Sequence, residues 1–294
     1  KKSTQQKMVS NRMKALDVSG NSGCTVQIIK YKGRDVIKKD TSNLEYVHRL
    51  RAQIDKQKRF KQNLPVNSII CVPGILDEEI KNTSYSAYME YVPYNDFIEF
   101  FQIAGNDKIR QRITEVSNFI KSNITSEVHF SANNAIQAKL DELKIKIPRN
   151  SLCPELIDIF ENIEMKLLTK EVFLPSGNCH GDLTFSNMLF SLSTNNVCIF
   201  DFLDSYIESP WIDIVKIRQD THFYWSLRKT KKNFDVVRLK QVLNWIDKYI
   251  VNKFKIDSET YKILQAVNIL RIFPYANDGE DLIFLEKCLL ELGI

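Results

Sequence analysis

The hydrophobic periodicity of this chain changes once, near residue 95, and that change restricts the fold more than any other feature. Before it, short runs rich in β-branched and aromatic residues alternate with turn residues, which is typical of strands. After it, apolar residues recur every three or four positions, which is typical of helices with one buried face. We therefore predict an α+β protein, with a strand-rich part over residues 1–93 and a mostly helical part over residues 94–294.

The strand-rich part begins with a hairpin and a helix. Residues Thr25–Lys39 are expected to form two strands around a tight turn, and Asn43–Gln62 carry a single apolar stripe that predicts a partly exposed helix. Two further apolar runs, Ser68–Val72 and Ser86–Val92, predict strands. Pro93 ends the second of these strands because proline cannot donate to a ladder.

Five stretches of the second part carry apolar residues at helical spacing and predict helices. They are Ile109–Ile120, Leu156–Leu167, Val236–Ile250, Tyr261–Leu270 and Leu282–Leu289. A second hairpin is expected to interrupt them at residues 178–202, where two short apolar runs flank a turn of Ser, Thr and Asn.

The densest polar cluster of the chain lies at this second hairpin. His180–Asn187 comes directly before the first strand, and Asp201 comes directly after the second. Because a hairpin brings its two ends together, we expect Asp182, Asn187 and Asp201 to converge. Two carboxylates and a carboxamide oxygen are the hard ligands that Mg²⁺ prefers, and one carboxylate would remain to accept a proton.

Other interpretations of the same residues are available. Each of them alone is an ordinary turn residue or strand-end cap, and only their joint spacing favours a site. A zinc site built on His180 is disfavoured because no second His lies four residues away and the six cysteines are poorly spaced for zinc.

The residues HGDLTFSN at His180–Asn187, followed by IFDF at Ile199–Phe202, resemble the aminoglycoside phosphotransferase and choline kinase group, relatives of the protein kinases. The first motif is similar to the group's H-x-D-x-x-x-x-N catalytic loop. Ser209–Ile214 also resembles the segment in which a later Asp helps to hold that loop. The resemblance implies a protein kinase-like two-lobed fold, with a five-stranded antiparallel N-lobe, a helical C-lobe, and ATP and Mg²⁺ bound between them.

The resemblance also implies roles for the catalytic residues. Asp182 would orient or deprotonate the acceptor hydroxyl, and Asn187 and Asp201 would hold Mg²⁺ against the nucleotide phosphates. His180 would brace the loop rather than act as an acid or base. The phosphoryl donor would be ATP, or GTP in its place.

In the N-terminal part, the resemblance implies a nucleotide-binding loop and lysine. Gly20, Ser22 and Gly23 lie just before the first hairpin, where backbone N–H groups can approach phosphates. Lys38 ends a V-I-K run that is similar to the family's ATP-anchoring lysine, and strand alternation places its neighbour Lys39 on the opposite, solvated face.

Two features of the N-terminal part qualify this scheme. The family's usual helix Glu is missing from the middle of the predicted helix, where Gln53, Asp55 or Gln57 would give a weaker contact to the lysine. Met89–Val92 is either a simple edge strand or a linker in which the backbone of Glu90 and Val92 binds the adenine edge.

Composition limits the partners. The 41 Lys and Arg exceed the 36 Asp and Glu by too little to indicate nucleic acid binding, and no apolar run is long enough to span a membrane. The absence of an apolar leader and the scattered cysteines predict a cytoplasmic protein with reduced thiols.

Two function hypotheses follow. The first is an ATP-dependent phosphotransferase whose acceptor is a hydroxyl of a small molecule of the sugar, aminoglycoside or amino-alcohol type. The second is a catalytically silent kinase-like module that binds nucleotide or acts as a scaffold.

Overall fold

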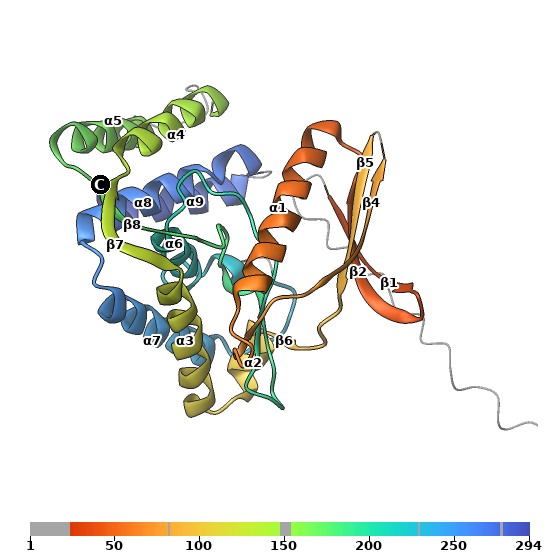
Figure 1. The fold of residues 1–294 in the computed structure, drawn as a ribbon. Helices are drawn as coiled ribbons and strands as arrows, with labels where there is room; N and C mark the ends of the chain where they lie inside the picture. Colours follow the sequence, from red (N-terminus) through yellow and green to blue (C-terminus); the bar gives the residue numbers. More distant parts are fainter. Residues whose placement is uncertain (1–23, 82, 148–153, 229, 277–278) are drawn as a thin grey trace, which may run out of the picture. The chain divides into compact units, whose positions relative to one another are not determined.

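The computed structural model describes residues 24–81, 83–147, 154–228, 230–276 and 279–294 (Figure 1). The chain divides into two compact units. The sheet unit comprises the chain up to Ile54 together with Pro73–Tyr91, and the helical unit comprises Asp55–Val72 together with Val92–Ile294.

The sheet unit contains a four-stranded antiparallel sheet. Its strands, in the order β1-β2-β5-β4, are β1 (Thr25–Tyr31), β2 (Arg34–Thr41), β5 (Ser84–Glu90) and β4 (Ile75–Lys81). The predicted first hairpin is confirmed, and its turn residues Lys32 and Gly33 both have positive φ, as a two-residue hairpin turn requires. Strand β4 was not predicted, because this edge strand carries Asp and Glu instead of an apolar alternation.

Helix α1 (Leu44–Asn63) begins where Asn43 Oδ1 accepts the backbone N–H of Glu45 at 3.0 Å. Within the sheet unit, Leu50 and Ile54 of this helix pack on Tyr85 and Ala87 of strand β5. Figure 1 shows the helix beside strands β2 and β5. The predicted helix is therefore confirmed, and burial of its apolar stripe explains its position against the sheet.

One expected strand lies in a different sheet. Strand β3 (Ile70–Cys71) pairs in parallel with β10 (Val197–Ile199), which also pairs with β9 (Met188–Phe190), and β9 pairs with β6 (Asn95–Asp96). The described residues of the N-terminal part therefore form a four-stranded sheet, and the predicted strand at Ser68–Val72 is not part of it. A short apolar run shows that a segment is buried, but not which strand it pairs with.

The helical unit contains eight further α-helices in the described part of the chain and the hairpin formed by β7 (Ile124–Ser131) and β8 (Phe173–Gly177). The helices are α2 (Phe97–Ile103), α3 (Asn106–Ser122), α4 (Asn133–Lys146), α5 (Pro154–Thr169), α6 (Pro210–Thr221), α7 (Val236–Phe254), α8 (Ser258–Leu270) and α9 (Gly279–Leu292). The five helices predicted from periodicity are confirmed as α3, α5, α7, α8 and α9.

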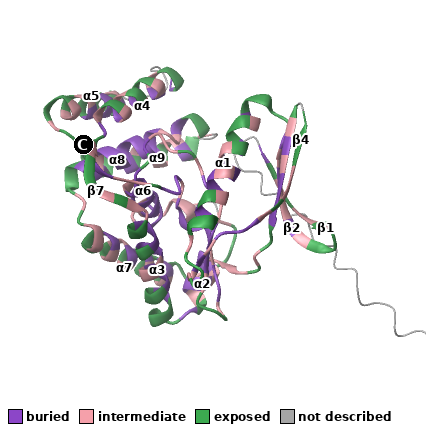
Figure 2. Cartoon of the chain, in the orientation of Figure 1, coloured by how far each residue is buried: buried purple, intermediate pink, exposed green. Residues whose placement is uncertain are grey.

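Helices α6 and α8 are the most deeply buried helices of this unit, and Figure 2 colours both largely purple. Between its apolar residues, α6 also buries five polar ones, Asp213, Lys216, Gln219, Asp220 and Thr221. Burying charged groups is costly unless they are paired or hydrogen-bonded. The buried polar residues of α6 therefore indicate where specific contacts have been built.

Candidate active site

The predicted second hairpin is present, and it brings its two ends together as expected. Strands β9 and β10 pair antiparallel, and η2, a single 3₁₀ turn over Phe185–Asn187, leads into β9. The backbone N–H of Phe200 donates to Asn187 O at 3.2 Å, and that of Leu203 donates to His180 O at 3.0 Å. Residues 180–187, which we call the catalytic loop after their predicted role, thus lie beside the segment that carries Asp201.

Asp182 is held at both carboxylate oxygens. Lys216 Nζ lies 3.0 Å from Oδ1, and Asn187 Nδ2 donates to Oδ2 at 2.9 Å. Burial opposes ionisation of this carboxyl, but the ammonium of Lys216 outweighs it and lowers the pKa of Asp182 below its ordinary value. Asp182 is therefore a carboxylate with a fixed orientation at neutral pH.

Asn187 and Asp201 offer oxygen atoms suited to a magnesium ion. Asn187 Nδ2 uses its two hydrogens on Asp182, at 2.8 Å to the backbone O and 2.9 Å to Oδ2, which fixes the amide and leaves Oδ1 without a partner among the described residues. Asp201 has a positive φ of 63°, a conformation that a non-glycine residue adopts only when its surroundings impose it. Carboxylate and amide oxygens are ligands that Mg²⁺ takes in proteins, so Asn187 and Asp201 would suit this ion.

His180 is fully buried, and its ring makes two hydrogen bonds. Its Nδ1 accepts the backbone N–H of Asp182 at 3.2 Å, so Nε2 carries the hydrogen that it donates to Phe200 O at 2.9 Å. Burial lowers the pKa of His180 to about 4, and the imidazole is neutral at pH 7. Its ring packs on Phe202 with centroids 4.2 Å apart. These contacts suit a residue that braces the loop.

Helix α6 holds the backbone of the catalytic loop through two buried carboxylates. Asp213 accepts the backbone N–H groups of His180 at 2.7 Å and Gly181 at 2.9 Å. Asp220 accepts those of Phe185 at 2.7 Å and Ser226 at 3.0 Å. Burial outweighs these hydrogen bonds and raises the pKa of Asp213 to about 7 and that of Asp220 to about 6. The expected loop-holding Asp is thus present as Asp213.

The backbone conformation and the close neighbours of Gly181 leave no room for a side chain. Its φ is +89°, and a Cβ atom there would lie 2.1 Å from Leu203 O. The close approach lets the catalytic loop and the segment after Asp201 share a backbone hydrogen bond. The glycine of the HGD motif is therefore required by packing.

Sequence reasoning missed Lys216 and Asp220. Both lie on α6 with Asp213, at positions i+3 and i+7, and so share one helix face. A signal for them was present in the sequence. Asp213, Lys216 and Asp220 recur at helical spacing, and the first two lie within the apolar run Ile212–Ile217.

A family model described as the Phosphotransferase enzyme family matches residues 17–230, which include the catalytic loop, Asp201 and the whole of α6. The chain belongs to this phosphotransferase family. A search of curated proteins by sequence gave no match.

Solved structures with a similar fold are aminoglycoside phosphotransferases. A thermostable mutant of APH(4)-Ia, in ternary complex with ADP and hygromycin B, has a TM-score of 0.65 at 9% identity, over 95% of this chain and 93% of that chain. The streptomycin–ATP complex of APH(2")-IIa has a TM-score of 0.60 at 12% identity, over 95% and 91% of the two chains. The protein thus has the kinase-like, two-lobed α+β fold of these enzymes, with an antiparallel sheet in its N-terminal part and a helical C-terminal part.

The two candidate nucleotide-binding lysines of β2 have different surroundings in the structure. Lys38 lies 3.3 Å from Asp40 and exposes 26% of its side chain. Lys39 is buried and donates to Gln53 Oε1 of α1 at 3.4 Å. The expectation of a solvated Lys39 is therefore wrong, because that face of β2 is covered by α1. Of the helix residues considered as replacements for the usual Glu, Gln53 makes a hydrogen bond to a lysine of β2.

The remaining predicted nucleotide ligands divide into two groups. Gly20, Ser22 and Gly23 lie outside the described residues. Glu90 ends β5, where its Oε2 accepts the backbone N–H of Gly74 at 2.6 Å, and Val92 O accepts the backbone N–H of Tyr94 at 2.9 Å. The backbone N–H of Glu90 also donates to Gly74 O at 2.9 Å, so the end of β5 is held by the residue just before β4.

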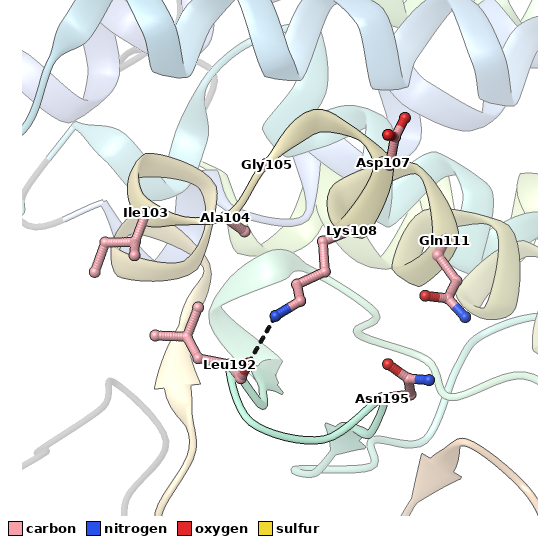
Figure 3. A pocket seen from close by; sticks show the side chains of 8 residues that line it. All are labelled: Ile103, Ala104, Gly105, Asp107, Lys108, Gln111, Leu192 and Asn195. Carbon is pink, nitrogen blue, oxygen red and sulfur yellow. Dashed lines mark hydrogen bonds between the residues drawn. The ribbon is translucent and has the colours of Figure 1, made fainter.

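A surface pocket of about 600 Å³ lies elsewhere in the helical unit and contains none of the candidate site residues (Figure 3). It is lined by the end of α2, the start of α3 and the turn between β9 and β10. Lys108 crosses it and donates to Leu192 O at 2.9 Å. Beneath the turn, the buried Arg112 donates to Thr194 O and Asn195 Oδ1, both at 2.8 Å. Helix α3 therefore anchors the turn of the hairpin.

The described helices include none long and apolar enough to cross a membrane.

Proposed function

We propose that this protein transfers the γ-phosphoryl group of ATP, or of GTP, to a hydroxyl of a small molecule. The observation that carries the proposal is the 2.9 Å hydrogen bond from Asn187 to the Asp182 carboxylate, on a loop bonded to the segment that carries Asp201. Membership of the phosphotransferase family supports it. Phosphoryl transfer needs positioning and charge stabilisation more than covalent chemistry, and this loop supplies both.

Asp182 is the proposed catalytic residue. Its carboxylate accepts a hydrogen bond from the acceptor hydroxyl and takes the proton as the oxygen attacks the γ-phosphorus and the bond to the β-phosphate oxygen breaks. His180 is a positioning residue, because its neutral ring holds the backbone N–H of Asp182 and Phe200 O.

Asn187 Oδ1 and Asp201 are the proposed magnesium ligands. When bound, the ion would neutralise charge on the nucleotide phosphates. Among the described residues no three His, Cys, Asp or Glu side chains gather as a metal site. Because only two side chains are proposed as its ligands, the ion would be held jointly by the protein and the nucleotide.

We assign nucleotide binding to Lys38 and the backbone of Glu90 in the sheet unit, to the backbone of Val92, and to Gly20, Ser22 and Gly23, which precede β1 in the sequence. The structures of similar fold hold ADP, ATP or GDP by their descriptions. Their hygromycin B, streptomycin and kanamycin are amino sugars with many hydroxyl groups, which supports the sugar, aminoglycoside and amino-alcohol classes as first acceptors to test.

The test is ADP release from Mg·ATP and Mg·GTP in the presence of kanamycin, hygromycin B, streptomycin, choline, ethanolamine or glucose, with a water-only reaction beside each. Asp182→Asn should abolish acceptor-dependent release while the circular dichroism spectrum is retained. Asp158→Asn, an exposed carboxylate on α5, is the matched control and should stay active. An active Asp182→Asn enzyme contradicts the assignment, and nucleotide binding without turnover of any acceptor favours the silent module.

A further inference from the structure

Three residues of α6 make polar contacts with the catalytic loop. Two of them bind backbone groups of the loop, and the third contacts a side chain. Asp213 and Asp220 accept backbone N–H groups. Lys216, on the same helix face between them, contacts the carboxylate of Asp182. The first two residues fix the path of the loop, whereas Lys216 acts on the group that we assign to the chemistry.

The buried ammonium of Lys216 forms an ion pair with the carboxylate of Asp182. Its side chain is only 11% exposed, and its ammonium lies 3.0 Å from Asp182 Oδ1. Its second partner among the described residues is the neutral Gln219 Oε1, at 3.5 Å. A buried ammonium is costly unless an opposite charge lies close to it. Asp182 is that charge, so the two residues stabilise each other.

The two oxygens of Asp182 are held from different elements. Lys216 of α6 holds Oδ1, and Asn187, in the single turn before β9, holds Oδ2. A carboxylate held at both oxygens cannot rotate about its Cβ–Cγ bond, yet each oxygen keeps a lone pair for a further hydrogen bond. Fixing a catalytic group in its reactive orientation lowers the barrier without any movement during the reaction.

A residue of helix α8 extends the hydrogen-bond network around Lys216. Asn268 Nδ2 donates to Gln219 Oε1 at 2.9 Å, and both side chains are buried. The same Gln219 oxygen receives Lys216. A row of buried polar groups therefore runs from α8 through Gln219 and Lys216 to Asp182.

We propose that Lys216 is a positioning residue for phosphotransfer, which fixes the Asp182 carboxylate in the orientation that receives the acceptor hydroxyl. This inference rests on the proposed function. Because Lys216 acts on the carboxylate and not on the nucleotide, its loss should reduce kcat and leave KM for Mg·ATP nearly unchanged.

The kinetic test compares Lys216→Met, which keeps the length of the side chain, with Lys216→Arg, which keeps the charge. With an acceptor from the panel above that the wild-type enzyme phosphorylates, Lys216→Met should lower kcat by about 30-fold or more and change KM for Mg·ATP by less than about threefold. Lys216→Arg should regain a substantial part of kcat. Lys139→Met is the control, because Lys139 is also largely buried and paired, with Glu142 at 2.6 Å on α4.

A double-mutant cycle of Asp182→Asn and Lys216→Met tests the pairing without any activity. Lys216→Met should lower the midpoint of thermal unfolding, and the double variant should recover part of that loss because no unpaired charge is left.

The outcomes separate the two proposals. An active wild type with an unchanged kcat in Lys216→Met overturns the positioning role and leaves the proposed function standing. A wild type that is inactive with every acceptor overturns the proposed function and the positioning role with it, and coupling in the cycle then describes a structural ion pair.

Discussion

The carboxylate of Asp213 accepts the backbone N–H of His180 at 2.7 Å, so a residue of α6 holds the first residue of the catalytic loop. The same carboxylate accepts Gly181, and it is fully buried. The loop is therefore organised by the helix that follows it in sequence, and its conformation depends on the packing of α6.

Replacing Asp213 should reduce both stability and activity. Asp213→Asn removes one acceptor oxygen and directs an NH₂ group at a backbone N–H, which should cost about 1 to 3 kcal/mol of unfolding free energy. Urea unfolding measures the loss, with the exposed Asp158→Asn as control. An unchanged midpoint would show that Asp213 does not hold the loop.

A series of Gly→Ala substitutions should separate clash from backbone strain. Gly105→Ala meets open space at an ordinary φ and should be nearly neutral, and Gly33→Ala, with φ of +79° and no neighbour within 4 Å, should cost about 1 kcal/mol. Gly181→Ala adds a clash with Leu203 O and should cost about 2 kcal/mol or more, with loss of activity. Equal effects at the three positions would contradict this order.

The buried His180 should make the protein sensitive to acid. Its folded pKa of about 4 lies below the ordinary 6.5, so the unfolded chain takes up a proton that the folded one does not as the pH falls below 6.5. Stability from this group is present above pH 6.5 and is lost on the way to pH 4, by about 2 kcal/mol at pH 5.

The comparison with His180→Gln isolates this effect. Asp213 is present in both proteins and changes their stability in the opposite direction. Burial raises its pKa to about 7, so this group favours the folded state as the pH falls. Chemical unfolding at pH 7.5 and pH 5 should therefore show a larger loss for the wild type than for the variant. Parallel pH profiles would mean that His180 is protonated in the folded state.

The two lysines of β2 should differ in the property that they affect. Lys38→Met should weaken Mg·ATP binding about tenfold or more, because Lys38 is the proposed phosphate ligand and retains solvent exposure. Lys39→Met should mainly change thermal stability, since Lys39 is buried against Gln53. Calorimetric titration and thermal unfolding of both variants check this, and the reverse result would assign the phosphate to Lys39.

Local patterns in the sequence were sufficient for the hairpin that carries Asn187 and Asp201. The alternation of apolar runs and turn residues located β9 and β10, and proximity of the hairpin's ends followed from geometry. The pairing of Ile70 with Val197 could not be predicted in this way, because it joins two short strands far apart in sequence. Likewise, the contact of Lys216 with Asp182 depends on how α6 packs, which no local pattern specifies.

The anchoring of the hairpin turn by Arg112 and Lys108 has a practical consequence for engineering. Ser193, Thr194 and Asn195 are exposed and rich in turn chemistry, which would ordinarily recommend the site for an epitope tag or a fluorescent-protein insertion. Here the main-chain oxygens of Leu192 and Thr194 are held by side chains of α3. An inserted sequence would pull the Thr194 carbonyl away from the buried guanidinium of Arg112 and the Leu192 carbonyl away from the ammonium of Lys108, and it would disturb the register of β9 and β10. Labels therefore belong elsewhere on this protein.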